Sequence, residues 1–195
     1  MKLGIIGTGA LGSAIARDLV KAGYELVLSN SRGPDSLEDV ALDLGPLAKP
    51  GTVRDAAAAD VVFLAVRWNQ VKSALTGLPP WGGRIVVDAT NPVAAPAGRT
   101  SSEIVASLVP GARLVKAFNT LPPPLLLADP LKGEGHRVLF LSGDDHAARE
   151  TVAQLIESIG FAPIDLGTLI EGGKLQQDPG GPLPRLDLVK FSKSR

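Results

Sequence analysis

Short apolar runs alternate along the chain with stretches in which apolar residues recur every three or four positions. The apolar runs predict β-strands at residues 3–6, 25–29, 52–53, 61–66, 84–88, 113–117, 137–142 and 161–165. The intervening periodicity predicts α-helices at residues 14–20, 34–44, 54–59, 69–76, 101–109 and 144–159. A strand–helix repeat of this kind predicts an α/β fold of the Rossmann-like, doubly wound type, with a mostly parallel sheet.

One run, residues 60–66, is apolar after its first residue, which is typical of a central parallel strand buried on both faces. Ligands of open α/β sheets bind outside the carboxyl ends of the strands, so we expect Val66, Arg67 and Trp68 to overhang a cofactor. Trp68 is open to two interpretations. Its ring either flanks the nicotinamide or adenine, or anchors the following helix to the sheet.

Turn-forming residues dominate the last part of the chain. Glycines and prolines recur from residue 167 onward and exclude a long helix, although a short one fits within 169–177. Three consecutive prolines at 122–124 likewise prevent a helix from following the strand at 113–117 directly. We therefore predict one dinucleotide-binding domain, residues 1–166, with residues 167–195 as a short irregular C-terminal arm of the same domain.

Three glycines lie between the first predicted strand and the first predicted helix. Gly7, Gly9 and Gly12 match G-x-G-x-x-G, in which the first glycine permits a tight turn and the third lets the helix pack on the strand. The second lets a pyrophosphate approach the backbone, where the helix N-terminus favours an anion. The motif therefore predicts a dinucleotide site, and the alternative is a plain glycine turn.

The residues after the second predicted strand indicate which dinucleotide binds. NAD-binding domains carry an Asp or Glu about 20 residues after the glycines, which accepts hydrogen bonds from the ribose and would repel a phosphate. This chain has Asn30, Ser31 and Arg32 there instead. Amide, hydroxyl and guanidinium donors suit the 2′-phosphate of NADP, because arginine offers an oxyanion a fixed fork of donors. The alternative is that Ser31 and Arg32 merely cap the helix predicted from Pro34.

Composition excludes several classes of partner. The 195 residues carry a formal net charge of zero, so no electrostatic argument favours nucleic acid or an anionic membrane, and 4% aromatic residues do not suggest a base-stacking surface. Without cysteine the chain has no disulfide, no thiolate chemistry and no cysteine metal site, and we predict no metal. The apolar start at residues 3–6 is too short for a signal peptide or membrane span, which predicts a cytoplasmic protein.

Several motifs together resemble the coenzyme F420-dependent NADP reductase family. They are residues 7–12, 30–32, 116–120, 142–145 and 160–167. The same pattern is similar to the cytosolic reductase domain of the six-transmembrane metalloreductases. The resemblance implies a Rossmann-like fold and hydride transfer between NADPH and a small-molecule acceptor, either the deazaflavin coenzyme F420 or a flavin, FMN or FAD. It also implies a homodimer, in which a partner subunit or the C-terminal arm closes the cleft.

The resemblance also assigns roles to single residues. By this similarity, the residues that contact the pyrophosphate are Thr8, Ala10 and Leu11, and those that hold the 2′-phosphate are Ser31 and Arg32. Those that line the nicotinamide half are Val66, Ala89, Ala117 and Asn119, and we place Asn91 of the same loop as Ala89 beside them. Two positions depart from the family pattern: Pro34-Asp35-Ser36 lacks a phosphate-binding lysine, and Arg67 replaces a common proline, so that it can meet an anionic acceptor.

Hydride transfer between stacked rings needs no protein nucleophile, so we predict no catalytic side chain. His136 and His146 fit surface positions, and Lys116 is either a desolvated base or a charge near the sheet edge. Two alternatives to a reductase remain. A hydroxyacid-type dehydrogenase would need a following helical domain, for which about thirty residues are too few. A non-catalytic NADPH-binding sensor accounts for the absent acid or base equally well.

Overall fold

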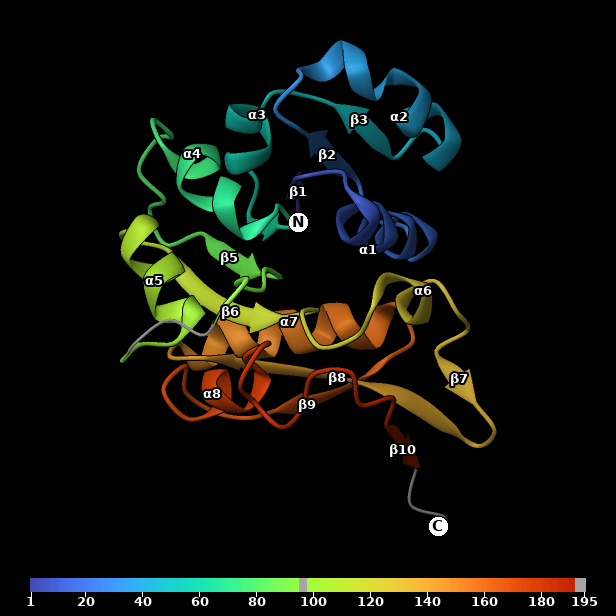
Figure 1. Cartoon of the computed structure of the whole chain (residues 1–195). Helices are drawn as coiled ribbons and strands as arrows, with labels where there is room; N and C mark the ends of the chain where they lie inside the picture. The colour runs from blue at the N-terminus through green and yellow to red at the C-terminus, as the bar shows by residue number, and fades with distance from the viewer. Residues whose placement is uncertain (95–97, 192–195) are drawn as a thin grey trace.

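A mostly parallel sheet with helices on both faces forms the centre of the protein (Figure 1). The computed structural model describes residues 1–94 and 98–191, and within these ranges ten strands join into one sheet. The strands are β1 (Leu3–Ile6), β2 (Leu26–Ser29), β3 (Ala48–Pro50), β4 (Val61–Leu64), β5 (Ile85–Asp88), β6 (Arg113–Ala117), β7 (Leu131–Lys132), β8 (Gly135–Gly143), β9 (Ala162–Asp165) and β10 (Val189–Phe191). Their order is β10-β8-β6-β5-β4-β1-β2-β3, with β7 and β9 also pairing with β8.

The six strands β1 to β6 pair in parallel, and their carboxyl ends therefore meet at one edge of the sheet. The chain order reverses at β1, which lies between β2 and β4, and this is the switch point at which doubly wound sheets bind ligands. β8 runs antiparallel to β6 and parallel to β9. The predicted α/β fold of the Rossmann-like type is confirmed.

Helices cover both faces of the sheet. They are α1 (Ala10–Lys21), α2 (Glu38–Leu44), α3 (Val53–Ala57), α4 (Val71–Leu75), α5 (Ser101–Leu108), α6 (Pro123–Leu126), α7 (His146–Ser158) and α8 (Gly172–Gln176), with 3-10 turns at Pro34–Leu37 and Trp68–Gln70. Alternate residues of β4 separate the two cores: Val61 and Phe63 pack with residues of α1 and α7, whereas Val62 and Leu64 pack with residues of α3, α4 and α5. β4 is thus the central strand buried on both faces that its apolar run predicts.

One local prediction was wrong. The third strand lies at β3, not at residues 52–53, because Thr52 caps α3: its hydroxyl accepts from the backbone N–H of Asp55, and the Asp55 carboxylate accepts from the Thr52 N–H. A capping box outweighs the weak strand preference of two residues. The helices predicted at 34–44 and 69–76 each begin as a 3-10 turn, and the proline run opens the single turn of α6.

The predicted C-terminal arm folds back onto the same domain, although its residues 192–195 lie outside the described residues. It contains α8, within the range where a short helix fits, and β10, a strand that the sequence does not predict. α8 packs closely on β8, since a Cβ atom on Gly172 would lie 2.6 Å from the Cβ of Ser142. Further along, the guanidinium of Arg137 in β8 donates to the Asp187 carboxylate at 2.6 Å. Hydrogen bonds from Arg137 and Lys132 hold the pKa of Asp187 below its usual range.

None of the helices in the described part of the chain is both long and apolar enough to cross a membrane.

Candidate functional site

The glycine turn between β1 and α1 has the geometry that a dinucleotide requires. Gly7 has φ +104°, and a Cβ there would lie 2.6 Å from the carbonyl oxygen of Ala65. A Cβ on Gly12 would overlap the carbonyl oxygen of Gly7, so α1 packs directly against the turn. Gly9 differs from both, because a Cβ on Gly9 would have no atom of the described residues within 4 Å. The turn and the close helix packing are therefore fixed by two glycines, and the second glycine leaves open space.

That open space lies at the N-terminus of α1. Gly9 is the N-cap residue, and within the described residues no side chain caps the helix and no acidic residue occupies its first turn. The backbone N–H groups of the first turn are available to an anion, and the helix dipole favours one. The Ser13 hydroxyl donates to the Thr8 carbonyl at 3.2 Å and fixes the turn from the helix side. Contact of Thr8, Ala10 and Leu11 with a pyrophosphate remains a prediction that this geometry fits.

The loop after β2 lies beside the glycine turn. The Asn30 amide nitrogen is 3.5 Å from the Thr8 hydroxyl oxygen and 3.0 Å from that of Ser36, while the Asn30 amide oxygen accepts from the Arg32 backbone N–H at 2.8 Å. Asn30 therefore shapes the loop, and the side chains of Ser31 and Arg32 remain exposed. Binding of a 2′-phosphate by Ser31 and Arg32 remains a prediction that this exposed loop fits.

The three site residues predicted at the end of β4 have different environments in the structure. Val66 lies against the glycine turn, with its Cγ1 2.8 Å from where a Gly7 Cβ would be. Arg67 is exposed, and its carbonyl accepts from the Gln70 N–H at 2.8 Å. Trp68 is half-buried and packs on the core that contains α4, which favours the interpretation of Trp68 as the anchor of the following helix.

A buried ion pair joins the ends of β5 and β6. Asp88 and Lys116 are register partners, their side chains are fully buried, and the Lys116 Nζ lies 3.1 Å from Asp88 Oδ2. Lys116 also donates to the Thr90 carbonyl, and Asp88 accepts from the Thr90 N–H, the Thr90 hydroxyl and the Ser102 hydroxyl. Lys116 is thus neither a charge near the sheet edge nor an unpaired base, because β6 lies between β5 and β8.

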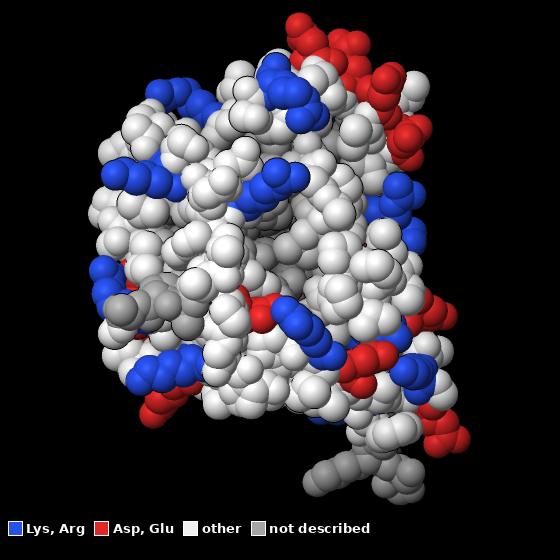
Figure 2. Space-filling view, viewed as in Figure 1, with Lys and Arg blue, Asp and Glu red and all other residues white. Residues whose placement is uncertain are grey.

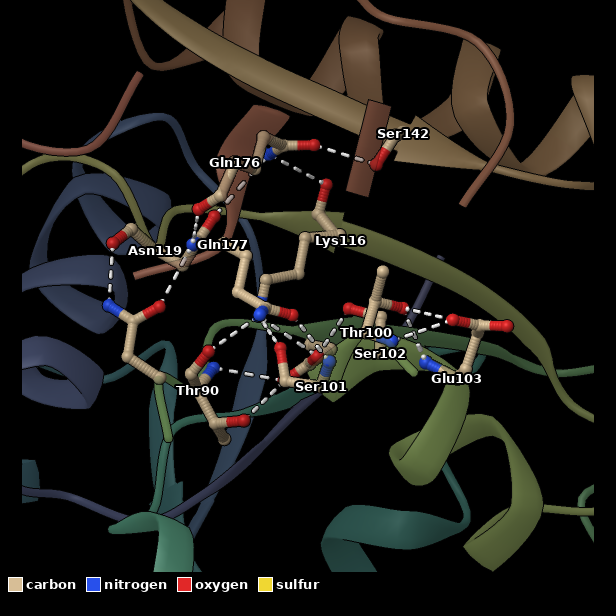
Figure 3. A network of polar contacts seen from close by, with 12 residues as sticks. Thr90, Thr100, Ser101, Ser102, Glu103, Lys116, Asn119, Ser142, Gln176 and Gln177 are labelled. Carbon is tan, nitrogen blue, oxygen red and sulfur yellow. Dashed lines mark hydrogen bonds and ion pairs between the residues drawn. The ribbon is translucent and has the colours of Figure 1, made fainter. Parts of the chain in front are cut away.

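A second polar network lies beside this pair and reaches the C-terminal segment (Figure 3). The Asn119 amide nitrogen donates to the Asn91 side-chain oxygen at 2.9 Å and to the Gln176 carbonyl at 2.7 Å, and the Asn91 amide donates to the Asn119 carbonyl at 2.8 Å. The Gln176 side chain is fully buried and accepts from the Ser142 hydroxyl at 2.7 Å. The structure therefore brings together Asn91 and Asn119, as predicted, and adds Gln176.

The backbone turns sharply after β6. Phe118 has φ +64°, an uncommon conformation for a residue with a side chain, and its buried ring meets Phe63 edge to face at 5.6 Å. Ala89 and Ala117, predicted to line the nicotinamide half, are 2% and 0% exposed and belong to the core. The accessible part of this region is consequently polar, with half-buried Asn91 at its surface.

Figure 2 shows that this face of the molecule is hollowed near its centre, where Figure 1 places the ends of β5 and β6. Lysine and arginine side chains surround the hollow, and mostly uncharged residues line it. Asp18, a carboxyl group with a raised pKa, lies away from the glycine turn in the last turns of α1. Burial raises the pKa of Asp18 to about 6, against the opposing effect of Lys21 and Arg17.

Sequence reasoning missed Asp88, Ser102, Ser142 and Gln176. Asp88 and Lys116 carry a usable signal, because each is a charged residue near the end of an otherwise apolar predicted strand, and the two strands are neighbours. Gln176 carries none. Gln176 lies in a segment with turn-like composition, and its partners Lys116 and Asn119 are 60 and 57 residues away in the sequence.

The sheet order and the glycine turn define the protein as a dinucleotide-binding domain of the Rossmann type. Residues 2–92 match the model of a family described as NADP oxidoreductase, coenzyme F420-dependent. The metalloreductase STEAP3 of Rattus norvegicus is 30% identical over 193 residues, which cover 94% of this chain and 37% of that protein. The chain thus spans little more than a third of that relative's length.

Two solved structures are also similar. The hypothetical protein SMa0349 from Sinorhizobium meliloti is 50% identical with a TM-score of 0.91, over 97% of this chain and 96% of that one. A protein from Arthrobacter sp. FB24, provisionally assigned as an F420-dependent NADP reductase, is 26% identical with a TM-score of 0.74, over 87% and 86%. The chain is thus similar to the NADP oxidoreductase family over residues 2–92 and to the metalloreductases over most of its length, which confirms the predicted resemblance.

Proposed function

We propose that the protein transfers a hydride between NADPH and a deazaflavin or flavin. The observation that carries the proposal is the open position over Gly9 at the N-terminus of α1, with the exposed Arg32 loop on one side and the polar end of β5 and β6 on the other. A dinucleotide of this length requires an anion site at its middle and polar contacts at both ends. The similarity of residues 2–92 to an NADP oxidoreductase family supports the same conclusion.

The residues present fit NADP(H) in three groups. Thr8, Ala10 and Leu11 would present the turn and helix N-terminus to the pyrophosphate. Ser31 and Arg32 would hold the 2′-phosphate, and no carboxylate follows β2 within that exposed loop of residues 30–33 to repel it. At the other end, Val66 and Asn91 would border the nicotinamide.

Bound NADPH supplies the hydride, so the chain's task is to position two rings and exclude competing reactions. Aligning two reactants is worth up to about 7–11 kcal/mol of the barrier, which leaves no need for an acid or base. The buried ion pair supports this division of work, because Lys116 at the end of β6 is held by Asp88 and is not an unpaired base.

We place the acceptor near Arg67. The exposed guanidinium at the end of β4 suits an acceptor with an anionic tail, which coenzyme F420, FMN and FAD all carry. The name assigned to the Arthrobacter protein favours F420, and that of STEAP3 favours a protein that passes electrons onward to a metal.

The test is anaerobic stopped-flow oxidation of NADPH, followed at 340 nm with FMN, FAD or coenzyme F420 in separate experiments. We expect acceptor-dependent oxidation with at least one of them, and slower oxidation of NADH than of NADPH. Tight NADPH binding without oxidation by any of the three acceptors would contradict the proposal and favour the NADPH sensor instead.

A further inference from the structure

Gln176 is the most buried polar side chain that the C-terminal segment contributes to the site (Figure 3). Its Nε2 lies 3.1 Å from the Phe140 carbonyl oxygen and 3.3 Å from the Asn119 Oδ1, and its Oε1 accepts from the Ser142 hydroxyl at 2.7 Å. A donor nitrogen facing acceptors and an acceptor oxygen facing a hydroxyl leave only one orientation of this amide. Gln176 is therefore rigidly held.

This rigidity passes to Asn119. Both hydrogens of the Asn119 amide are in use, one on the Gln176 carbonyl and one on the Asn91 side-chain oxygen, while its own oxygen faces the Gln176 amide. Asn119 is 5% exposed. It has no hydrogen left to donate to a ligand, so donation here falls to its neighbour Asn91.

Asn91 is the member of this network that faces outward. It is half-buried, and within the described residues its amide nitrogen spends one hydrogen on the Asn119 carbonyl. Within the described residues, the second hydrogen of this amide makes no hydrogen bond. The three amides thus form a relay that fixes the direction of one outward donor.

We infer that Gln176 is a positioning residue for the nicotinamide end of NADP(H), an assignment that rests on the proposed binding of this cofactor. Gln176 does not touch the ligand. It holds Asn119, which holds Asn91, whose remaining N–H meets the carboxamide of the nicotinamide. The C-terminal segment thereby completes a site whose other residues come from β1 to β6, and residue 176 determines how well the ring is oriented.

The test compares two ligands on the full chain, NADP⁺ and 2′-phospho-ADP-ribose, which lacks the nicotinamide ring. Gln176→Met keeps the length of the side chain but removes every hydrogen bond of the amide. We expect its affinity for NADP⁺ to fall about tenfold, the loss of one well-placed hydrogen bond, and its affinity for 2′-phospho-ADP-ribose to stay within about twofold of wild type. Titration calorimetry measures both.

Gln177→Met is the matched control. Gln177 is the adjacent residue and also ties the segment to the rest of the domain, because its Oε1 accepts from the N–H of Ser101 at the start of α5 at 2.8 Å. Within the described residues, its side chain makes no hydrogen bond to the amide relay. We expect its affinity ratio for the two ligands to equal that of wild type. If Gln176→Met does not fold, Ser142→Ala removes only the hydroxyl that orients Gln176, and should shift the same ratio in the same direction by a smaller factor.

An unchanged ratio in Gln176→Met, or an equal loss for both ligands, would overturn the role of Gln176, because a merely structural effect does not distinguish the two ligands. This outcome is separate from that of the proposed function. Wild-type protein that binds NADP⁺, but whose NADPH is oxidised by none of the acceptors, would refute the reductase activity. The affinity ratio for the two ligands would still decide the role of Gln176.

Discussion

Loss of the Lys116 charge should destabilise the protein strongly. Lys116→Met keeps the aliphatic stem of the side chain but leaves the Asp88 carboxylate buried without its counter-ion and the Thr90 carbonyl without its donor. Removing one partner of a buried ion pair costs about 3–5 kcal/mol. Asp88 retains hydrogen bonds from the Thr90 N–H, the Thr90 hydroxyl and the Ser102 hydroxyl, so we expect a value near the lower end, about 3 kcal/mol.

The double variant Asp88→Asn, Lys116→Met separates the charge from the packing. An amide at position 88 is neutral and its oxygen can still accept from Thr90, so the double variant should recover about 2 kcal/mol of the loss. Urea unfolding monitored by circular dichroism gives these free energies of unfolding. Lys72→Met, at an exposed lysine of α4, is the control and should change the free energy of unfolding by less than about 0.5 kcal/mol.

A loss below about 1 kcal/mol in Lys116→Met would refute the reasoning, since the pair would then contribute no more than an exposed salt bridge. A double variant less stable than Lys116→Met would also refute it, because the unpaired carboxylate could not then be the source of the cost.

Three further predictions concern the cofactor, pH and assembly. Arg32→Ala should reduce the preference for NADPH over NADH by roughly ten- to a hundredfold in fluorescence titrations with little change in NADH affinity, and an equal loss for both would remove Arg32 from the phosphate pocket. Because burial raises the pKa of Asp18 to about 6, its ionised form opposes folding, and stability should fall as pH rises from about 4 to 6. Asp18→Asn should flatten this slope and, allowing for partial exposure, gain about 1 kcal/mol at pH 7 in thermal unfolding; a steeper slope would contradict it. Sedimentation velocity should show a homodimer, and a monomer at all concentrations would exclude one. Truncation before Gly172 should lower the melting temperature, since α8 and β10 pack on β8. An unchanged melting temperature would show that the segment adds no stability.

Local signals in the sequence predicted the parts of the site that depend on local geometry. The glycine turn could be inferred because φ +104° at Gly7 and the close packing at Gly12 are requirements that only glycine meets. The apolar run of β4 likewise predicted burial on both faces. A 2′-phosphate site at the Arg32 loop was predicted because Asn30, Ser31 and Arg32 replace the carboxylate of NAD-binding domains, and it stays a prediction.

Contacts between distant segments could not be inferred in this way. Thr52 and Val53 have the composition of a strand, and only the hydrogen bonds with Asp55 show that Thr52 begins a helix. The environment of Lys116 depends on β8 covering β6, which places a lysine inside the sheet rather than at its edge. Asn119 was predicted as a direct ligand contact, but its full set of hydrogen bonds is visible only once Gln176 is placed beside it.

The position of Gln176 in the chain has a consequence for the order of folding. The turn at Gly7 and the Arg32 loop depend on contacts within the first 66 residues, whereas the amide relay joins residue 91 to residues 119, 142 and 176. Long closed loops delay such contacts, and a chain made from its N-terminus presents residue 176 late. During synthesis, the residues that form the glycine turn are therefore present before those that complete the amide relay. On the proposed binding of NADP(H), a nascent chain that lacks α8 lacks the contacts that orient Asn119 and Asn91, so the site is complete only when nearly the whole chain has emerged.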